Sequence, residues 1–501
     1  MTETKREIER KYESDESGLP DLTGAGGVAS VLDRGVAELD ATYYDTSDLR
    51  LASASITLRR RTGGSDAGWH LKLPVGPGVR DEIRAPLSDA VPDELAGLVR
   101  SRVREGQLVP VVRLRSSRDV RDLVDARGRL LAEAGVDAVR ADRLFGGEGS
   151  AQWTEIEVEL ADGGDPALLD KVEKRLRKAG VRPSRSASKL ARALAETKGG
   201  HPRPRDTGPA EPVTAGDHVL AYIRAQRDAI VELDPAVRRD AEEAVHDMRV
   251  ATRRLRSTFR SFRKVLDRGV TDPIAAELKW LAGELGVGRD HEVLAERLGT
   301  ALGEVPSALV SGPVHERLHS WAKAGEHGSR RRLLGVLDSP RYLTLLDTLD
   351  AVVADPPTLK AAVRKPDKVL AKAVRKDFDK VSALVDEALE QPPGHDRDEA
   401  MHEARKKAKR TRYAAENATP AVGGAAKALA KRMKSLQSLL GDHQDSVMAR
   451  QTLRELSAVA HAAGESAFTY GLLYGREEAR AQLAEEALPR VWKATQASME
   501  V

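Results

Sequence analysis

The chain contains no cysteine among its 501 residues, which excludes disulfide bonds, thiolate metal ligands and a cysteine nucleophile. Aromatic residues make up only 4% of it, so few side chains are available to stack on the bases of single-stranded nucleic acid. No apolar run is long enough to span a bilayer, and the N-terminus lacks the apolar segment of a secretory signal. We therefore expect a cytoplasmic protein without membrane contact, and we do not expect nucleic acid as a partner.

Net charge and length set two further limits. The formal net charge is only +3, so any binding of a polyanion must come from local clusters of basic side chains. A chain of 501 residues is too long for one ordinary core, and two or more domains are expected. Residues 199–212 hold four prolines and three glycines, a composition that ends both helices and strands. We interpret 199–212 as a linker between a domain at 1–198 and a domain at 213–501.

The first domain combines segments of alternating pattern with a few helical ones, which predicts an α+β fold built on antiparallel strands. The predicted strands include residues 42–46, 55–61, 68–73, 79–87, 109–115, 130–138 and 152–160, and the predicted helices are 91–105, 165–180 and 186–197.

Charged residues in these strands recur two positions apart, beginning with Glu7, Glu9 and Lys11. Side chains two apart on a strand share one face, and a closed antiparallel barrel would point that face into its lumen. An alternative is that each strand simply turns a charged face to solvent, but the pattern on six strands of one small domain favours the lumen. The acidic candidates are Glu7, Glu9, Asp137, Glu155, Glu157 and Glu159, and the basic candidates are Lys11, Arg59, Arg61, Lys72, Arg84, Arg113 and Arg115.

The two sets of side chains predict a combined chemistry. Carboxylate oxygens are suitable ligands for Mg²⁺ or Mn²⁺, and guanidinium and ammonium groups are suitable for phosphate. Together they indicate metal-assisted phosphoryl transfer, with water as the nucleophile. Glu157 or Glu159 could act as general base through that water, and Lys11 could instead tune it. The sequence does not decide between these roles.

Residues 213–501 are rich in alanine, leucine, arginine and glutamate with a 3.6-residue period, which predicts an all-α domain. This half contains an internal repeat, near 213–350 and 360–497. His402 follows His246 by 156 residues, and a Leu-Gly pair with an aspartate four residues after the glycine lies downstream of each histidine. We expect two duplicated helical bundles, in which Asp290 and Asp445 pair with nearby arginines.

Each repeat carries basic residues spaced three and four apart, which places them on one helix face. These basic stripes have two explanations: solvated faces with ion pairs to neighbouring glutamates, or binding of a polyanion whose charge offsets the repulsion. Two duplicated copies, each beginning with histidine, favour the polyanion. The stripe residues are His246, Arg249, Arg253, Arg256 and Arg260 in the first repeat, and His402, Arg405, Lys409 and Arg412 in the second.

The first domain resembles the CYTH domains, or triphosphate tunnel metalloenzymes. Glu7-x-Glu9-x-Lys11 is similar to their ExExK signature, and further pieces follow in order, among them Leu58–Arg61, Trp69–Lys72, Glu155–Glu159 and Ser188-Lys189-Leu190. The resemblance implies an eight-stranded antiparallel tunnel that hydrolyses or cyclises triphosphates with a divalent metal. It implies metal ligation by Glu7, Glu9, Glu157 and Glu159, with Asp137 and Glu155 as further candidates, and triphosphate binding by Lys11, Arg59, Arg61, Lys72, Arg113, Arg115 and Lys189.

The second domain resembles the CHAD domain, a duplicated helical domain that commonly follows CYTH. The segments 245–256 and 401–412 carry the resemblance, which implies binding of inorganic polyphosphate and attachment to polyphosphate granules. We therefore expect a triphosphatase joined to a polyphosphate-binding module. The alternatives are a polyphosphate-binding, granule-associated protein without catalysis, thiamine-triphosphate hydrolysis, and adenylyl cyclisation.

Overall fold

The computed structural model describes residues 3–14, 18–201 and 211–497. The chain divides into two compact units, residues 1–205 and 206–501. Most of the predicted linker at 199–212 lies outside the described residues, and Gly199 at its start belongs to a short strand.

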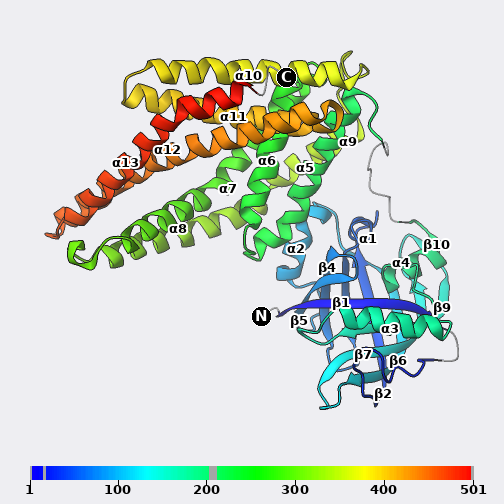
Figure 1. Ribbon diagram of the computed structural model, residues 1–501. Coiled ribbons are helices and arrows are strands. Elements are labelled where there is room, and N and C mark those ends of the chain that lie inside the picture. The colour runs from blue at the N-terminus through cyan, green and yellow to red at the C-terminus, as the bar shows by residue number, and fades with distance from the viewer. Residues whose placement is uncertain (1–2, 15–17, 202–210, 498–501) are drawn as a thin grey trace. The chain divides into compact units, whose positions relative to one another are not determined.

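The first unit is a closed antiparallel barrel in which the first strand pairs with the last, as the sequence predicted (Figure 1). The order around the barrel is β1-β5-β4-β3-β2-β6-β7-β9, and β8 pairs with β10 in a separate two-stranded sheet. The strands are β1 Glu3–Ser14, β2 Ser30–Asp45, β3 Thr57–Thr62, β4 Gly68–Gly76, β5 Val79–Ala85, β6 Val109–Val124, β7 Leu130–Arg143, β8 Gly147–Glu148, β9 Ser150–Leu160 and β10 Lys198–Gly199.

Two apolar clusters cover parts of the outer barrel surface. Helix α3 (Ala167–Lys178) packs Val172 and Leu176 against Tyr12, Ile156 and neighbouring side chains of β1, β7 and β9. Helix α2 (Asp93–Val103) packs against the outer face of β3, β4 and β5, and the short helix α1 (Arg50–Ser53) lies beside it. Since these alternate residues are buried outside, their neighbours on each strand point into the lumen.

Helix α4 (Lys189–Glu196) covers one end of the lumen. Its Leu190 and Leu194 pack against Leu114, Val139 and Trp153, whose side chains share the lumen face. Ser188 caps this helix by accepting a hydrogen bond from the Ala191 amide. Three features were not foreseen from the sequence: α1, the β8–β10 pair, and the greater length of β2 and β6.

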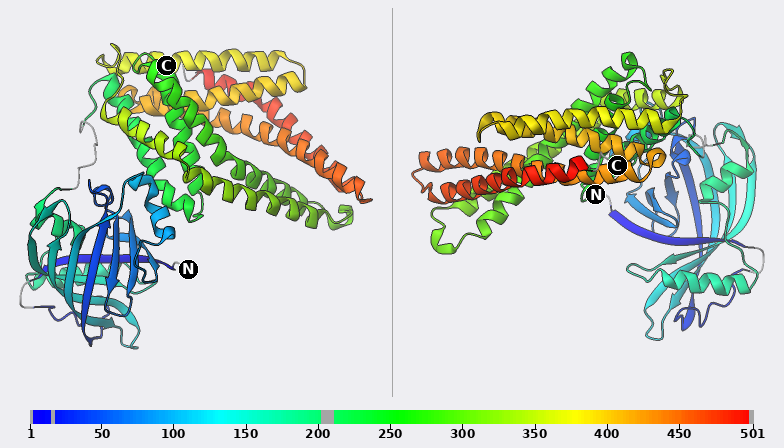
Figure 2. Two further views of the ribbon diagram at one scale, coloured as in Figure 1. Left: turned by 180° about the vertical axis from the view of Figure 1, so that it is seen from behind. Right: turned by 45° about the horizontal axis from the view of Figure 1, so that its top comes forward.

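The second unit consists of helices among its described residues, which confirms the predicted all-α class (Figure 2). None of the helices that the structure describes is long and apolar enough to cross a membrane. The helices are α5 Ala215–Arg238, α6 Ala244–Ser261, α7 Arg268–Gly303, α8 Val314–Leu337, α9 Pro340–Ala354, α10 Pro366–Glu390, α11 His395–Val422, α12 Gly424–Ala462 and α13 Phe468–Gln496, with a 3₁₀ turn at Ser307–Leu309.

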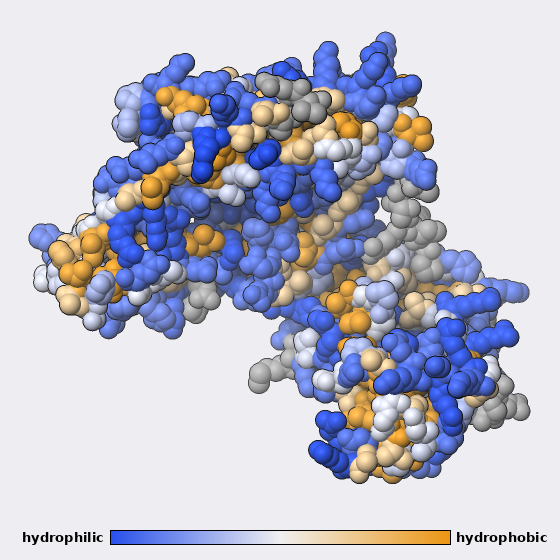
Figure 3. Space-filling model, in the orientation of Figure 1, coloured by the Kyte–Doolittle hydropathy of each residue, from blue (hydrophilic) through white to orange (hydrophobic). Residues whose placement is uncertain are grey.

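The two helical repeats share their hydrophobic cores. One large core draws residues from both repeats, from Val219 of α5 to Trp492 of α13. A second core joins the far ends of α7 and α8 to those of α12 and α13, through residues such as Leu302 and Leu453. The outer surface of this unit is mostly hydrophilic in the face shown in Figure 3. Because the cores are shared, the duplicated halves stabilise one another.

Candidate functional site

The charged residues of the first and last strands face one another across the β1–β9 ladder. Lys11 is the register partner of Glu157, and Glu9 is the partner of Glu159. The side chains of Glu7, Glu9 and Glu157 are largely buried although they carry charge. A buried carboxylate needs a cation or strong hydrogen bonds, so these pairings determine what the lumen can bind.

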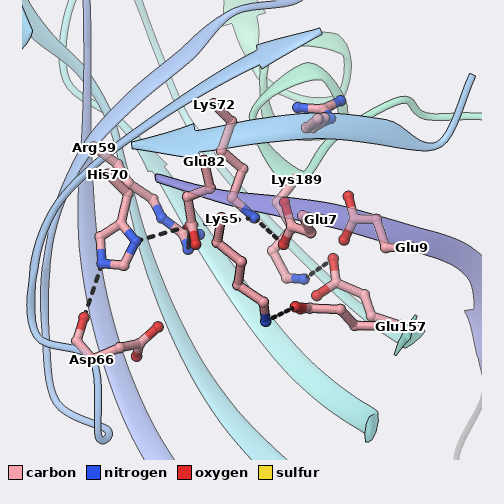
Figure 4. A network of polar contacts seen from close by, with 12 residues as sticks. Lys5, Glu7, Glu9, Arg59, Asp66, His70, Lys72, Glu82, Glu157 and Lys189 are labelled. Atoms are coloured by element: carbon pink, nitrogen blue, oxygen red, sulfur yellow. Dashed lines mark hydrogen bonds and ion pairs between the residues drawn. The ribbon is translucent and has the colours of Figure 1, made fainter. Parts of the chain in front are cut away.

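Lysine ammonium groups lie beside lumen carboxylates of β1 and β9, and Figure 4 shows Lys72 beside Glu7 and Lys189 beside Glu157. Lys72 Nζ lies 2.5 Å from Glu7 Oε1, and Lys5 Nζ lies 2.7 Å from Glu159 Oε1. Lys11 contacts both Glu9, at 3.0 Å, and Glu157. The lumen therefore already balances its charges by contacts between acidic and basic side chains.

Lys189 enters the lumen from the first turn of α4 and touches three carboxylates. Its Nζ lies 3.0 Å from Asp137 Oδ2, 2.8 Å from Glu155 Oε1 and 2.5 Å from Glu157 Oε1. Trp153 Nε1 also donates to Glu155 Oε2 at 2.7 Å. A cation at a helix N-terminus is unfavourable with respect to the helix dipole, and these carboxylates offset that effect. Asp137 and Glu155 thus hold Lys189 in place.

A histidine organises the opposite wall of the lumen. His70 Nδ1 lies 2.9 Å from Glu82 Oε1, and its Nε2 lies 2.9 Å from the Asp66 carbonyl oxygen, as Figure 4 shows. Burial lowers the pKa of His70 to about 4, and the adjacent Arg59 and Arg61 act in the same direction. A neutral imidazole can donate to only one of these two oxygens. Arg59 and Arg61 share this lumen face, and Arg61 pairs with Asp66.

The expected lumen position of Arg113 and Arg115 is wrong. Both project from the outer face of β6, where Arg113 Nη2 lies 2.5 Å from Asp40 Oδ2 and Arg115 Nη1 lies 3.5 Å from Asp142 Oδ2. Their strand neighbour Leu114 is the residue that faces inward, among apolar side chains at the α4 end. Charged residues on the outer face of a strand alternate in the same way as charged residues that face the lumen. Periodicity alone therefore could not place Arg113 and Arg115 on the correct face.

The arginine of β6 that does face the lumen is Arg118, which the sequence analysis missed. Its Nη2 lies 2.8 Å from Asp137 Oδ2 and 2.5 Å from Glu157 Oε2. Lys5 of β1 and Glu82 of β5 also face the lumen, and the sequence indicates both positions more clearly than that of Arg118. Lys5 extends the Glu7–Glu9–Lys11 alternation, and Glu82 lies two residues before Arg84. Arg84 faces the lumen as expected and lies 2.6 Å from Glu82 Oε2.

The lumen carboxylates differ in their affinity for protons. Burial alone would raise the pKa of Glu157, but Lys11, Lys189 and Arg118 outweigh it and hold that pKa well below its ordinary value. Burial and the neighbouring Glu7 raise the pKa of Glu159 despite its contact with Lys5. Of the two carboxylates considered as general base, Glu159 therefore has the greater tendency to accept a proton.

Two groups of carboxylates could hold a divalent cation. Oxygens of Asp137, Glu155 and Glu157 lie within 4.8 Å of one another, but the Lys189 ammonium contacts all three. At the other group, Glu9 stands directly opposite Glu159, and Glu7 Oε2 is buried without a hydrogen-bond partner among the described residues. Lysine ammonium groups contact carboxylates of both groups, and the unpartnered Oε2 of Glu7 favours the second group for Mg²⁺ or Mn²⁺.

In the helical unit, the two basic stripes lie on neighbouring helices. The α6 stripe runs beside that of α11, where Arg254 Nη2 lies 3.1 Å from Glu416 Oε2. Arg249 pairs with Asp290 at 2.6 Å, and Arg405 pairs with Asp445 at 3.3 Å, which confirms the expected pairs.

The glycines of the Leu-Gly segments make room for these arginines. A Cβ at Gly286 would lie 2.7 Å from Arg249 Nη2, and one at Gly441 would lie 3.3 Å from Arg405 Nη2.

The centre of this surface contains cations without ion pairs in the described part of the chain. Arg253 and Lys409 occupy matching positions of the two repeats, and neither contacts a carboxylate within 4.0 Å. Burial, together with Arg405, Arg253 and Arg249, lowers the pKa of Lys409 to about 7. The two stripes therefore form one concentrated basic surface, which we call the double stripe. It comprises His246, Arg249, Arg253, Arg256, Arg260, His402, Arg405, Lys409 and Arg412.

The outer members of the double stripe differ in their partners. Arg412 Nε donates to Glu416 Oε1 at 2.8 Å and lies near the ring of Tyr413. Arg260 is exposed at the C-terminal end of α6. Burial lowers the pKa of His402, and Lys406 adds to that effect.

Comparison with known proteins assigns both units. The CYTH domain family matches residues 5–194, and the CHAD domain family matches residues 221–454. CYTH domains comprise metal-dependent triphosphatases and cyclases. Two proteins of Mycobacterium tuberculosis, from different strains and called "Uncharacterized protein MT2285" and "Uncharacterized protein Rv2226", are each 41% identical to the chain. Each alignment covers 96% of the chain and 94% of the relative.

Two solved structures match the chain over a little more than half its length. "PptA from Streptomyces chartreusis" has a TM-score of 0.47 and 22% identity, covering 56% of this chain and 100% of its own. The CHAD domain from the plant Ricinus communis has a TM-score of 0.44 and 23% identity, covering 58% of this chain and 93% of its own. The match to both domain families, in order, and the full-length similarity to the mycobacterial proteins lead to one conclusion: the chain belongs to the family of proteins in which a CYTH domain is followed by a CHAD domain.

Proposed function

We propose that the tunnel unit hydrolyses inorganic triphosphate, or a closely related triphosphate, with Mg²⁺ or Mn²⁺. The observation that supports this most is the single enclosed lumen in which carboxylates of β1 and β9 face Lys72, Arg59 and Arg61. A triphosphate chain carries several negative charges in a row, and a tunnel with cations on more than one wall matches that distribution.

In this proposal the metal is held by Glu7, Glu9 and Glu157, and Glu159, which stands opposite Glu9, is kept as the base. When bound, it neutralises phosphate charge and lowers the pKa of water at the site. Arg59, Arg61, Lys72, Arg84 and Arg118 bind the phosphate oxygens, exchanging their carboxylate partners for the substrate.

The proton of the attacking water goes to Glu159, whose pKa burial and Glu7 raise. Lys11 contacts Glu9 and Glu157, so its role is to orient those two carboxylates. Asp137 and Glu155 are positioning residues in this scheme, because they hold Lys189 where it faces the substrate.

We also propose that the double stripe of the helical unit binds inorganic polyphosphate. Its support is the concentration of Arg253, Lys409 and their neighbours on two adjacent helices, where burial and then the nearby arginines lower the pKa of Lys409. A polyanion laid along α6 and α11 would relieve that repulsion, and its affinity should fall as salt rises. The helical unit would then hold the protein on polyphosphate granules.

The test is a panel of tripolyphosphate, thiamine triphosphate, ATP and long-chain polyphosphate against Mg²⁺, Mn²⁺ and Ca²⁺, with release of phosphate, pyrophosphate and cyclic nucleotide measured. We expect phosphate release from tripolyphosphate, and its loss in Glu7→Gln. The exposed Glu105 at the end of α2 provides a matched control, Glu105→Gln.

Three results would replace the proposal. Full activity in Glu7→Gln would remove the carboxylate site from the mechanism. Tight, salt-sensitive polyphosphate binding without turnover under any of the three metals would identify a binding protein, and preferential turnover of ATP or thiamine triphosphate would identify another member of the same enzyme class.

A further inference from the structure

A buried histidine in the helical unit faces two carboxylates from neighbouring helices. His443 of α12 is 1% exposed. Its Nε2 lies 3.2 Å from Asp398 Oδ1 of α11 and 3.4 Å from Glu485 Oε1 of α13. One ligand atom from each of the three residues lies within 4.8 Å of the other two.

The imidazole nitrogen is close to both carboxylates but makes no hydrogen bond. His443 Nε2 is buried without a hydrogen-bond partner among the residues that the structure describes. Burial of a polar nitrogen without a hydrogen bond costs free energy. A ligand placed between the nitrogen and the two oxygens would satisfy all three atoms at once.

The outer oxygens of the same carboxylates are directed toward arginines. Arg397 Nη1 lies 2.8 Å from Glu485 Oε2, and Arg450 Nη2 lies 3.7 Å from Asp398 Oδ2. This arrangement leaves the inner oxygens, Asp398 Oδ1 and Glu485 Oε1, turned toward His443. Contacts of this kind behind the ligands are characteristic of metal sites, where they fix the direction of each donor atom.

The helical repeat does not require a histidine here. His443 comes three residues after Leu440, and Gly288 comes three residues after the matching Leu285 of the first repeat. A Cβ at Gly288 would lie 2.8 Å from Ser329 Oγ of α8, so this position also faces the neighbouring helix of its hairpin. The same fold therefore forms with a glycine at this place, and the histidine cluster is a property of the second repeat.

We propose that Asp398, His443 and Glu485 bind a divalent transition-metal ion that links α11, α12 and α13. One imidazole nitrogen and two carboxylate oxygens suit Zn²⁺, which takes both kinds of donor, whereas Mg²⁺ prefers oxygen alone. Three ligands from three helices leave the remaining coordination positions to water. The ion would stabilise the packing of the second repeat, since ligands from separate helices come together only in the folded state.

The experiment measures Zn²⁺ binding to the full chain after treatment with a chelator, by equilibrium dialysis and elemental analysis. The variants are His443→Gln and Glu485→Gln, and the matched control is His461→Gln, an exposed histidine at the end of the same helix. Tunnel carboxylates also take up cations, so the quantity of interest is the difference between chains. We expect wild type and the His461 variant to hold one more Zn²⁺ equivalent than the other two variants.

A second measurement uses Co²⁺ in place of Zn²⁺ and records its visible absorption in the wild-type chain, which reports on a nitrogen ligand. This spectrum should be lost in Glu485→Gln. Because that substitution keeps the size of the side chain, it tests the metal site even if His443→Gln folds poorly. Equal Zn²⁺ content in wild type, Glu485→Gln and His443→Gln would overturn the proposal and leave His443 as a member of an ion-paired cluster only.

Discussion

The guanidinium group of Arg118 makes a bidentate contact with the carboxylate of Asp137 in the lumen of the barrel, with Nε 2.8 Å from Oδ1 and Nη2 2.8 Å from Oδ2. The Asp137 side chain is fully buried, and its only other cation within ion-pair distance among the described residues is Lys189. A two-fold contact of this kind fixes both groups, so Arg118 is held on the lumen wall where a phosphate would pass.

Arg118→Ala is therefore expected to lower kcat/KM for the preferred triphosphate by about 100-fold, roughly 3 kcal/mol of transition-state stabilisation. Arg115→Ala provides the comparison, since Arg115 projects from the outer face of the same strand. Steady-state kinetics should show less than about a two-fold change for Arg115→Ala. Equal effects of the two substitutions would contradict the assignment of Arg118 to the lumen.

Lys189→Met should destabilise the barrel. The substitution leaves Asp137, Glu155 and Glu157 without the ammonium group that contacts all three, and removal of one partner from a buried ionic cluster costs about 3–5 kcal/mol. Hydrogen exchange of the β9 amides with increasing denaturant measures this change. Lys174→Met on the exposed face of α3 is the control. An unchanged exchange rate in Lys189→Met would show that water or another cation takes its place.

The stability of the barrel should depend on His70 below neutral pH. Its pKa is lowered to about 4 in the folded state from 6.5, so the unfolded chain binds more protons between these values. The free energy of unfolding should therefore fall as pH decreases from 6.5 to 4, by an amount on the order of 2–3 kcal/mol for this residue. In His70→Gln this part of the pH dependence should disappear from denaturant melts. Identical pH profiles of the free energy of unfolding in wild type and His70→Gln would refute this contribution of His70.

Polyphosphate binding should weaken as pH rises from about 7 to 9, because burial and the neighbouring arginines lower the pKa of Lys409 to about 7. At pH 8, polyphosphate binding must therefore be accompanied by protonation of Lys409. Isothermal titration calorimetry in buffers of different ionisation enthalpy detects this proton uptake. Lys409→Arg should bind with little pH dependence in this range, since arginine stays charged. Arg253 shows that the matching position of the first repeat accommodates arginine. Loss of polyphosphate binding in Lys409→Arg would contradict a role for the positive charge at this position.

Much of the tunnel site was predictable from the alternation of charge. Glu7, Glu9, Glu157, Lys72 and Arg59 face the lumen because side chains on a strand alternate strictly, and β1 pairs with both β5 and β9 as a closed barrel requires. The prediction failed on β6. Arg113 and Arg118 lie on opposite faces of that strand, and its outer face is also charged, so periodicity could not show which arginine faces inward.

The order of a strand domain and a helical domain, the lumen face of most strands and the duplicated basic helices could all be predicted from the amino-acid sequence. These features depend on local periodicity, which each segment carries independently of the others. The folded chain was needed to establish which face of β6 is enclosed, that Lys189 contacts three carboxylates, and that His443 lies beside acidic residues of two other helices. Such contacts join residues far apart in the chain, and their geometry follows from packing that no single segment specifies.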